Sequence, residues 1–282
     1  MSDHVSEFCA VDHDRPDLPP ALAPHMDKEI LINDFATRSF RDVADYDYVV
    51  ARMAYRSKLV PQFLWSALQA VEKYLKCILL LNRIPAKKVR HDLAAALELV
   101  RKHAPFELRL QDPSRKLIEH LDTYGRFRYL ETPFHVFGLE LAQLDMAVWD
   151  IRRYCRVLDY TVSLSNGRKQ PMLALELKKI EESEKRPPQQ FRLIGGALER
   201  LLEDSKHPAR EALTWQNLFF GVRVRKRVKL RRYLHATNSP LSLHPEILEE
   251  VLRYVFLPRE VVDAYRAELA RRSKGASRAA HP

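Results

Sequence analysis

The chain has 282 residues, of which 46% are hydrophobic, 30% are charged and only 7 are glycine. This size exceeds a single domain of about 100–150 residues, and the hydrophobic share excludes a largely disordered chain. The net charge of +10 is unevenly placed. Residues 1–166 carry 23 basic and 23 acidic side chains, whereas residues 167–282 carry 24 basic and 14 acidic ones. The basic excess of the second part predicts a polyanionic partner.

Cysteine content and apolar runs bear on the compartment and on metal chemistry. Cys9, Cys77 and Cys155 are too few and too far apart for a disulfide framework or a zinc site. The polar, acidic N-terminus does not resemble a signal peptide, and no apolar run approaches the roughly 20 residues of a membrane span. We therefore expect a cytoplasmic protein with no membrane partner. The chain has no phosphate-loop, dinucleotide-binding or hydrolase motif, so no cofactor and no metal is expected.

The first part of the chain has a helical pattern. Residues 1–26 are acidic and proline-containing, which predicts a disordered tail. Apolar residues then recur every three or four positions, which predicts helices over residues 45–56, 59–82, 91–102, 114–124 and 139–162. Five helices with short connections predict an all-α, antiparallel bundle over residues 27–165.

The last of these helices has a continuous apolar seam. Its steps of three and four residues favour a role in the bundle core, with a dimer contact as the alternative. The seam consists of Leu141, Leu144, Val148, Ile151, Cys155, Leu158 and Val162. The opposite face is predicted to be solvated or to extend a basic cleft, and it carries Arg152, Arg153 and Arg156.

The second part of the chain begins after a predicted linker at residues 166–171, where Asn-Gly and a proline follow the helix. Further helical patterns cover residues 172–185, 190–205, 208–220, 245–256 and 259–273. Residues 172–273 are therefore predicted to form a basic, mainly helical C-terminal domain. Residues 274–282 are predicted to be a disordered tail.

Two short motifs of the first part resemble a known superfamily. Glu72, Lys73 and Lys76 lie in an A-x-E-K-x-L-K pattern, and His91-Asp92-Leu93 begins the following helix. Residues 27–165 thereby resemble the HEPN superfamily (higher eukaryotes and prokaryotes nucleotide-binding), which implies a five-helix bundle. The same residues also have a structural interpretation. Glu72 and Lys76 have the spacing of a helical ion pair, and Asp92 suits a helix start.

An Arg-x6-His motif, formed by Arg128 and His135, directly precedes the 139–162 helix. The resemblance implies that this pair is catalytic in a metal-independent ribonuclease, which works as a homodimer with two pairs in one cleft. Arginine offers a fixed cationic fork to a phosphodiester, and histidine can exchange protons with the 2′-hydroxyl or the leaving 5′-oxygen near neutral pH. The alternative is that Arg128 forms a salt bridge at a helix end and His135 lies in a loop.

A basic segment between Gly221 and His235 contains seven cations and no acid. Such cations repel one another, and a polyanion relieves this repulsion, so we predict a nucleic-acid contact. Alternating valines favour a strand, although a helix also fits. The alternatives are a solvated strand or helix face, or an acidic protein partner. The predicted nucleic-acid-binding residues are Arg223, Arg225, Lys226, Arg227, Lys229, Arg231 and Arg232.

Together these features predict an HEPN-type RNA-binding protein that is a metal-independent endoribonuclease of the toxin or defence type. Arg128 is followed by Tyr129, as in non-catalytic members of the superfamily, and Pro133 interrupts the motif. The alternative is therefore a non-catalytic HEPN module that binds nucleotide or a protein partner, such as a nucleotidyltransferase or an antitoxin. A structural adaptor is the third interpretation.

Overall fold

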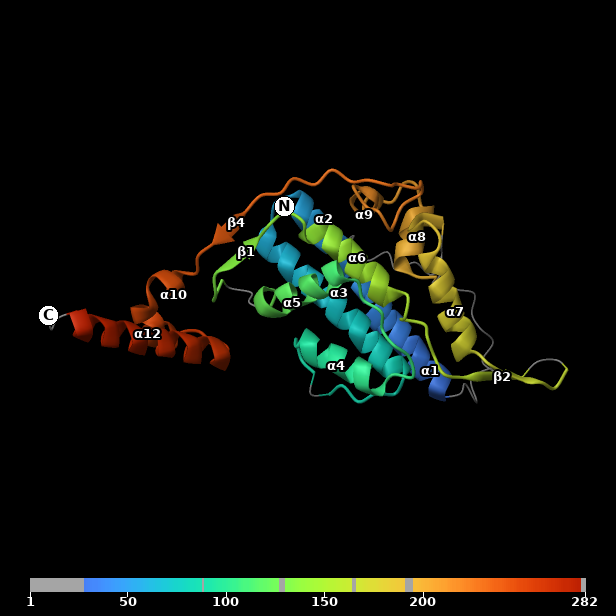
Figure 1. Cartoon of the computed structure of the whole chain (residues 1–282), viewed down its shortest axis with the longest axis horizontal. Helices are drawn as coiled ribbons and strands as arrows, with labels where there is room; N and C mark the ends of the chain where they lie inside the picture. Colours follow the sequence, from blue (N-terminus) through green and yellow to red (C-terminus); the bar gives the residue numbers. More distant parts are fainter. Residues whose placement is uncertain (1–27, 88, 127–129, 164–165, 191–194, 280–282) are drawn as a thin grey trace, which may run out of the picture.

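The computed structural model describes residues 28–87, 89–126, 130–163, 166–190 and 195–279. The fold is 60% helical with 4% strand, which confirms the all-α prediction (Figure 1). Among the described residues, no helix has both the length and the apolar character needed to cross a membrane. The predicted N-terminal tail and residues 280–282 lie outside the described residues.

A continuous helical segment opens the bundle. It consists of α1 (Lys28–Phe35), the π-helical stretch η2 (Ala36–Asp42) and α2 (Val43–Arg56). The long helix α3 (Val60–Leu81) follows, with Pro61 in its first turn, where a proline removes no intrahelical hydrogen bond. Most of its side chains are buried, because α3 packs against α2, α4, α5 and α6 at the centre of the bundle.

Three further helices complete the bundle. They are α4 (Leu93–His103), α5 (Asp112–Tyr124) and α6 (Glu140–Arg152). Asp92 caps α4 by accepting a hydrogen bond from Ala95 N at 2.7 Å, as its proposed structural role requires. These bounds agree closely with the predicted helices, except at the C-terminal end of α6.

The predicted helix over residues 139–162 is wrong beyond Arg152. Cys155 and Val157 are fully buried in a non-helical turn, where Asn82 Nδ2 donates to Val157 O at 3.3 Å. The three-and-four spacing therefore continues past the end of the helix, because buried turn residues also point towards the core. The seam residues from Leu141 to Cys155 are buried in the core of their own chain, which excludes them from a dimer contact.

Two small antiparallel ladders occur where no strand was predicted. Strand β1 (Phe134–Val136) pairs with β4 (His235–Thr237), so that His135 lies opposite Ala236. Strand β2 (Thr161–Ser163) pairs with β3 (Lys169–Pro171), which lies within the predicted linker. Strands of three residues are too short to produce a periodic sequence signal.

Helices α7 (Leu173–Glu184), α8 (Ala197–Glu203) and α9 (Arg210–Thr214) pack on the bundle, and the short 3₁₀ turn η3 (Pro188–Gln190) lies between α7 and α8 in the chain. The predicted helices over residues 190–205 and 208–220 are thus much shorter in the structure. Leu198, Leu213 and Phe220 are buried in the same hydrophobic core as α3. The domain boundary at residues 166–171 stays a prediction, which truncation of the chain at these residues would test.

Buried ion pairs connect α2 and α6 to this docked region. Arg152 bonds Asp45 at 2.7 and 2.8 Å and Glu199 at 2.7 and 2.6 Å, and all three side chains are largely buried. Arg52 contacts Asp145 and donates to Ala212 O at 2.9 Å. Removing one partner from such a pair leaves an uncompensated buried charge, which is strongly destabilising.

The prediction that Arg152 and Arg153 lie on a solvated face is therefore wrong, whereas Arg156 is partly exposed. Arg152 and Arg153 are each 4% exposed, and Arg153 donates to Trp149 O at 3.0 Å and Ser183 Oγ at 2.9 Å. Arg156 pairs with Glu176 at 2.8 Å. None of the three extends a basic cleft, because each is held by the region that packs over α6.

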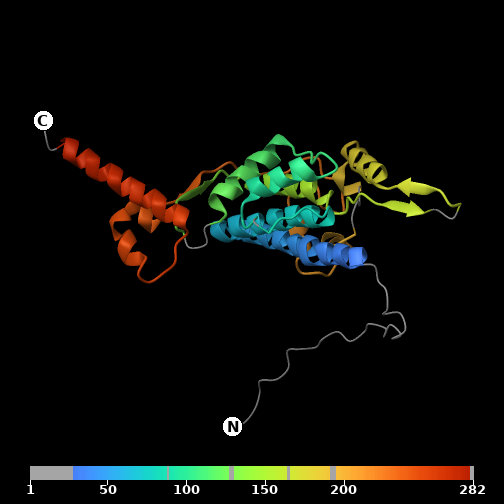
Figure 2. The same cartoon turned by 90° about the horizontal axis from the view of Figure 1, so that it is seen from below.

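The C-terminal residues form a small separate cluster at one end of the bundle (Figure 2). It comprises α10 (Pro240–Leu243), the 3₁₀ turn η4 (Pro245–Ile247), α11 (Leu248–Val251) and α12 (Arg259–Ala279). Helix α12 extends beyond residue 273, where the sequence predicted a disordered tail. Ser239 and Tyr265 attach the cluster to the bundle by donating to Glu131 O at 3.0 and 2.7 Å.

Candidate functional site

His135 lies on β1, at the end of the bundle where α5 finishes and α6 begins. Its half-buried ring contacts three others, with ring centroids 5.5 Å from His120, 5.1 Å from Tyr124 and 5.0 Å from Phe137. Arg128, the other predicted catalytic residue, and Tyr129 lie outside the described residues. The structure therefore places the imidazole and not the guanidinium of the Arg-x6-His motif.

His120 adds a second imidazole to this cluster. Its Nε2 is buried and has no hydrogen-bond partner within the described part of the chain. Burial lowers the pKa of His120, Glu140 acts in the opposite direction, and His135 adds to the lowering. A lowered pKa keeps His120 neutral at neutral pH, so it is suited to accept a proton rather than to hold one.

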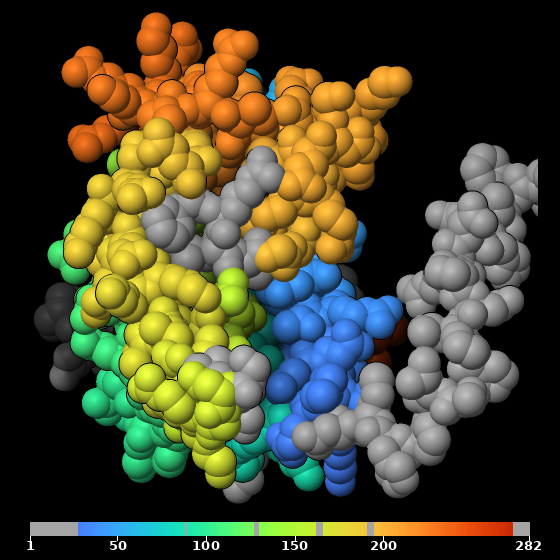
Figure 3. Space-filling view, turned by 90° about the vertical axis from the view of Figure 1, so that its right-hand side faces the viewer, coloured from blue at the N-terminus to red at the C-terminus, as the bar shows by residue number. Residues whose placement is uncertain are grey.

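The predicted nucleic-acid-binding residues lie on an extended, irregular segment that runs over the bundle from α9 to β4. The seven cations are exposed, and none of them forms a salt bridge with a described carboxylate. Figure 3 shows their region, in orange, with side chains projecting from one edge of the molecule. Residues 221–234 form neither the predicted strand nor a helix, and the first strand residue is His235.

The basic segment is held at both of its ends. Near α9, Gln216 Oε1 accepts from Lys229 N at 3.2 Å and from Arg225 Nη1 at 3.4 Å. At the other end, Tyr233 N donates to Phe137 O at 3.1 Å, directly before the β1–β4 ladder begins. The basic segment therefore continues directly into β4, which pairs with the strand that carries His135.

Gly138 allows this close crossing. Its φ of +81° lies in the left-handed region, and a Cβ there would lie 2.4 Å from Arg231 O and 2.7 Å from the Tyr233 ring. Tyr55 Oη donates to Gly138 O at 2.8 Å and fixes the same turn. Only glycine provides both the backbone conformation and the space for the basic segment to pass.

Glu140 is the acidic member of the site. It is 3% exposed, and its Oε1 accepts from Phe137 N at 2.5 Å at the start of α6. Its Oε2 has no hydrogen-bond partner among the described residues. Buried carboxylate oxygens are normally bonded, so an unpartnered one beside an aromatic cluster is a functional candidate.

The residues that carry the HEPN resemblance form a second cluster on α3. Glu72 is 4% exposed, and it bonds Lys76 at 2.5 Å and His91 Nδ1 at 2.7 Å. Lys73 pairs instead with Asp47 on α2. Glu72 is therefore not on a solvated helix face, and this cluster joins α3 to the start of α4 rather than contributing to the His135 site.

Sequence reasoning missed His120, Tyr124, Glu140 and Gln143 as members of this site. His120 and Tyr124 are one helical turn apart on α5, and Glu140 and Gln143 are three residues apart on α6. Both spacings place side chains on one helix face, which is the signal that could have found each pair. Their proximity to one another depends on how α5 packs against α6.

Comparison with known proteins adds no relative. No protein family, no curated protein and no solved structure matches this chain.

Proposed function

We propose that this chain is an HEPN-type protein that binds single-stranded RNA through its basic segment and cleaves it beside His135 without a metal ion. The observation that carries the proposal is the β1–β4 ladder. It pairs the end of the basic segment, whose seven exposed cations form no salt bridge with a described carboxylate, with the strand of an imidazole that lies in a cluster of rings. The sequence separates these features by about a hundred residues, and the fold brings them together.

The cations supply attraction that does not depend on RNA sequence. Each protein cation that neutralises a phosphate releases counterions condensed on the RNA, which adds a salt-dependent contribution to binding. An extended segment follows a phosphate backbone more readily than a short helix does, because its side chains are spread along several nucleotides. Tyr233 is 43% exposed within the same segment and offers a ring for a base to stack on.

Cleavage would use the 2′-hydroxyl as the nucleophile. His135 removes its proton, the 2′-oxygen forms a bond to phosphorus, and the bond from phosphorus to the 5′-oxygen breaks. The leaving oxygen takes up a proton from water, so the products are a 2′,3′-cyclic phosphate and a 5′-hydroxyl. His120 lies beside His135 and provides a second neutral imidazole that can accept a proton.

The test is incubation of the purified full-length protein with total RNA in EDTA. Wild-type protein should degrade the RNA, and His135→Ala should lower the rate by about 10²–10⁴-fold while RNA binding persists. His103→Ala, at an exposed position at the end of α4, is the matched control and should cleave at the wild-type rate. Equal cleavage by His135→Ala and wild type would refute the ribonuclease assignment.

A second variant tests the role of the basic segment. Replacing five of its cations by serine should weaken RNA binding regardless of sequence and reduce the salt slope by roughly 0.7 per lost phosphate contact. The five positions are Arg225, Lys226, Arg227, Arg231 and Arg232. A wild-type salt slope in this variant would mean that the segment contacts something other than nucleic acid.

A further inference from the structure

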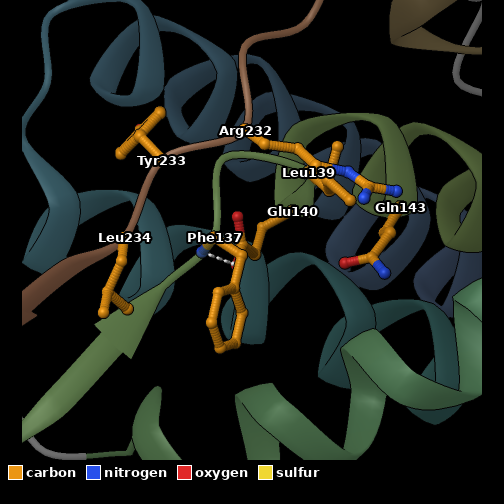
Figure 4. A pocket seen from close by; sticks show the side chains of 7 residues that line it. All are labelled: Phe137, Leu139, Glu140, Gln143, Arg232, Tyr233 and Leu234. Atoms are coloured by element: carbon orange, nitrogen blue, oxygen red, sulfur yellow. Dashed lines mark hydrogen bonds between the residues drawn. The ribbon is translucent and has the colours of Figure 1, made fainter.

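A pocket lies where the basic segment crosses the start of α6. Its volume is about 480 Å³, which is within the usual range for sites of small ligands. Figure 4 shows the Arg232 side chain reaching over α6 toward Gln143, and the hydrogen bond between Phe137 and Glu140. The side chains that bear on its chemistry are Phe137, Glu140, Gln143, Arg232, Tyr233 and Leu234.

Two polar groups of this pocket lack a partner among the described residues. Glu140 Oε2 is buried without a hydrogen bond to any of them, and Arg232 forms no ion pair with them. A buried acceptor without a donor costs free energy, so the wall of the pocket favours a ligand that brings N–H groups. Arg232 and its neighbouring cations disfavour a cationic ligand, so the N–H groups should belong to an anionic molecule.

The aromatic side chains in the wall of the pocket indicate that its anionic ligand contains a nucleobase. Phe137 is 52% exposed and Tyr233 is 43% exposed, although both border a pocket, and such rings are surfaces on which a base stacks. Arg232 is available for the phosphate of the same nucleotide. A nucleotide therefore satisfies the rings, the cation and the donor requirement together.

Guanine is the base whose edge fits the carboxylate. It presents two adjacent donors, N1–H and the N2 amino group, beside the O6 acceptor. Uracil has a single N–H between two acceptors, and adenine and cytosine place an acceptor next to their amino group. A carboxylate accepts only, whereas the Gln143 amide can donate to O6. The combination of Glu140 and Gln143 thus complements guanine better than the other bases.

We propose that this pocket binds a guanine base of single-stranded RNA, with Glu140 accepting from its N1–H and N2–H groups. The inference rests on the proposed RNA-binding function and deepens it. Phe137, in the wall of the pocket, contacts the ring of His135. Occupation of the pocket would therefore position the phosphate next to a guanine for cleavage, and Glu140 would determine specificity.

The experiment compares four RNAs of roughly nine uridines that differ only at the central base, which is G, A, C or U. They carry 2′-O-methyl groups to prevent cleavage, and binding to the full-length protein is followed by fluorescence anisotropy at one salt concentration. Wild type should bind the G-containing RNA roughly 5- to 100-fold more tightly than the others, as expected for a paired base-edge contact. Free guanosine monophosphate should compete weakly, because it lacks the flanking phosphates.

Glu140→Gln is the informative variant. Its amide oxygen can still accept from Phe137 N, while its NH₂ replaces the free acceptor with a donor, so the preference for G should disappear. Glu182→Gln removes the same charge at an exposed position of α7 and should keep the preference. Gln143→Ala should also lower the preference, which provides a test if Glu140→Gln does not fold.

Two results would overturn the inference. Equal wild-type affinity for all four RNAs, with a steep salt dependence, would refute the guanine pocket and leave the RNA-binding proposal standing. Retention of the G preference in Glu140→Gln would exclude Glu140 as its cause. Absence of binding to any RNA would instead refute the proposed function itself. Competition by guanosine monophosphate at the affinity of the RNA would identify free nucleotide as the ligand.

Discussion

Gly138→Ala tests whether the crossing of the basic segment couples RNA binding to cleavage. The new methyl group would lie 2.4 Å from Arg231 O, and φ is +81°. An alanine in the left-handed region costs about 1–2 kcal/mol. Relief of the clash displaces the segment and breaks the bond from Tyr233 N to Phe137 O, which adds about 1 kcal/mol. The expected loss of unfolding free energy is about 2–3 kcal/mol.

Gly167→Ala is the matched control. Gly167 has a φ of +78° and no atom of the described residues within 4 Å of the added Cβ, so only the backbone cost of about 1–2 kcal/mol applies. Gly138→Ala should therefore melt at a lower temperature than Gly167→Ala, by about 2–4 °C for each kcal/mol of unfolding free energy that the clash costs in addition. The comparison isolates the steric effect of the crossing from the preference of glycine for this conformation.

The functional readout of Gly138→Ala separates cleavage from binding. All seven cations remain, so the salt slope of RNA binding should equal that of wild type. A displacement of about 1 Å between the segment and His135 should lower the cleavage rate by about 10²-fold. If Gly138→Ala cleaves RNA as fast as Gly167→Ala and melts at the same temperature, the crossing of the basic segment over Gly138 does not couple RNA binding to cleavage.

Three further predictions concern stability and assembly. Arg152→Ala leaves buried Asp45 and Glu199 without their partner and should lower the unfolding free energy in urea by about 3–5 kcal/mol. Arg156→Ala, at a partly exposed pair, should lower it by about 1 kcal/mol or less. Equal losses in the two variants would contradict a stabilising role of the buried ion pairs of Arg152. Because burial lowers the pKa of His120, the unfolded state binds more protons as the pH falls below about 6.5, and stability should decrease. His120→Gln should reduce that acid sensitivity in melting curves recorded between about pH 7.5 and pH 5.5, and an unchanged pH profile would exclude His120 as its source. If cleavage requires two His135 sites, light scattering at micromolar concentration should show a homodimer, and a strict monomer that cleaves RNA would refute this requirement.

The helical class and the bounds of most bundle helices could be predicted from the amino-acid sequence. The three-and-four spacing identified the residues of α2, α3, α4 and α5 because the buried face of a helix repeats at that period. Asp92 also marked the start of α4, where its side chain accepts from Ala95 N. Local signals of this kind depend only on neighbours in the chain, so they can be found without knowledge of the fold.

The same signals failed where burial did not depend on a helix. Cys155 continues the seam beyond the end of α6 because it packs in a turn against α3, donating to Tyr74 O at 3.4 Å. Arg152 and Arg153 were predicted to be solvated because no sequence pattern shows which side chains the docked region covers. Their partners, Asp45, Glu199 and Ser183, are at least thirty positions away in the chain.

The composition of the candidate site depends on how distant segments of the chain pack together. His135 and the cations were recognisable in the sequence by their chemistry, but the pairing of their two segments depends on a ladder whose strands are three residues long. Glu140 and His120 had no motif to mark them, and they become notable only because packing buries an oxygen of one and a nitrogen of the other with no partner among the described residues. Charge and residue type are properties of the sequence, whereas unsatisfied burial arises only when distant segments exclude water together.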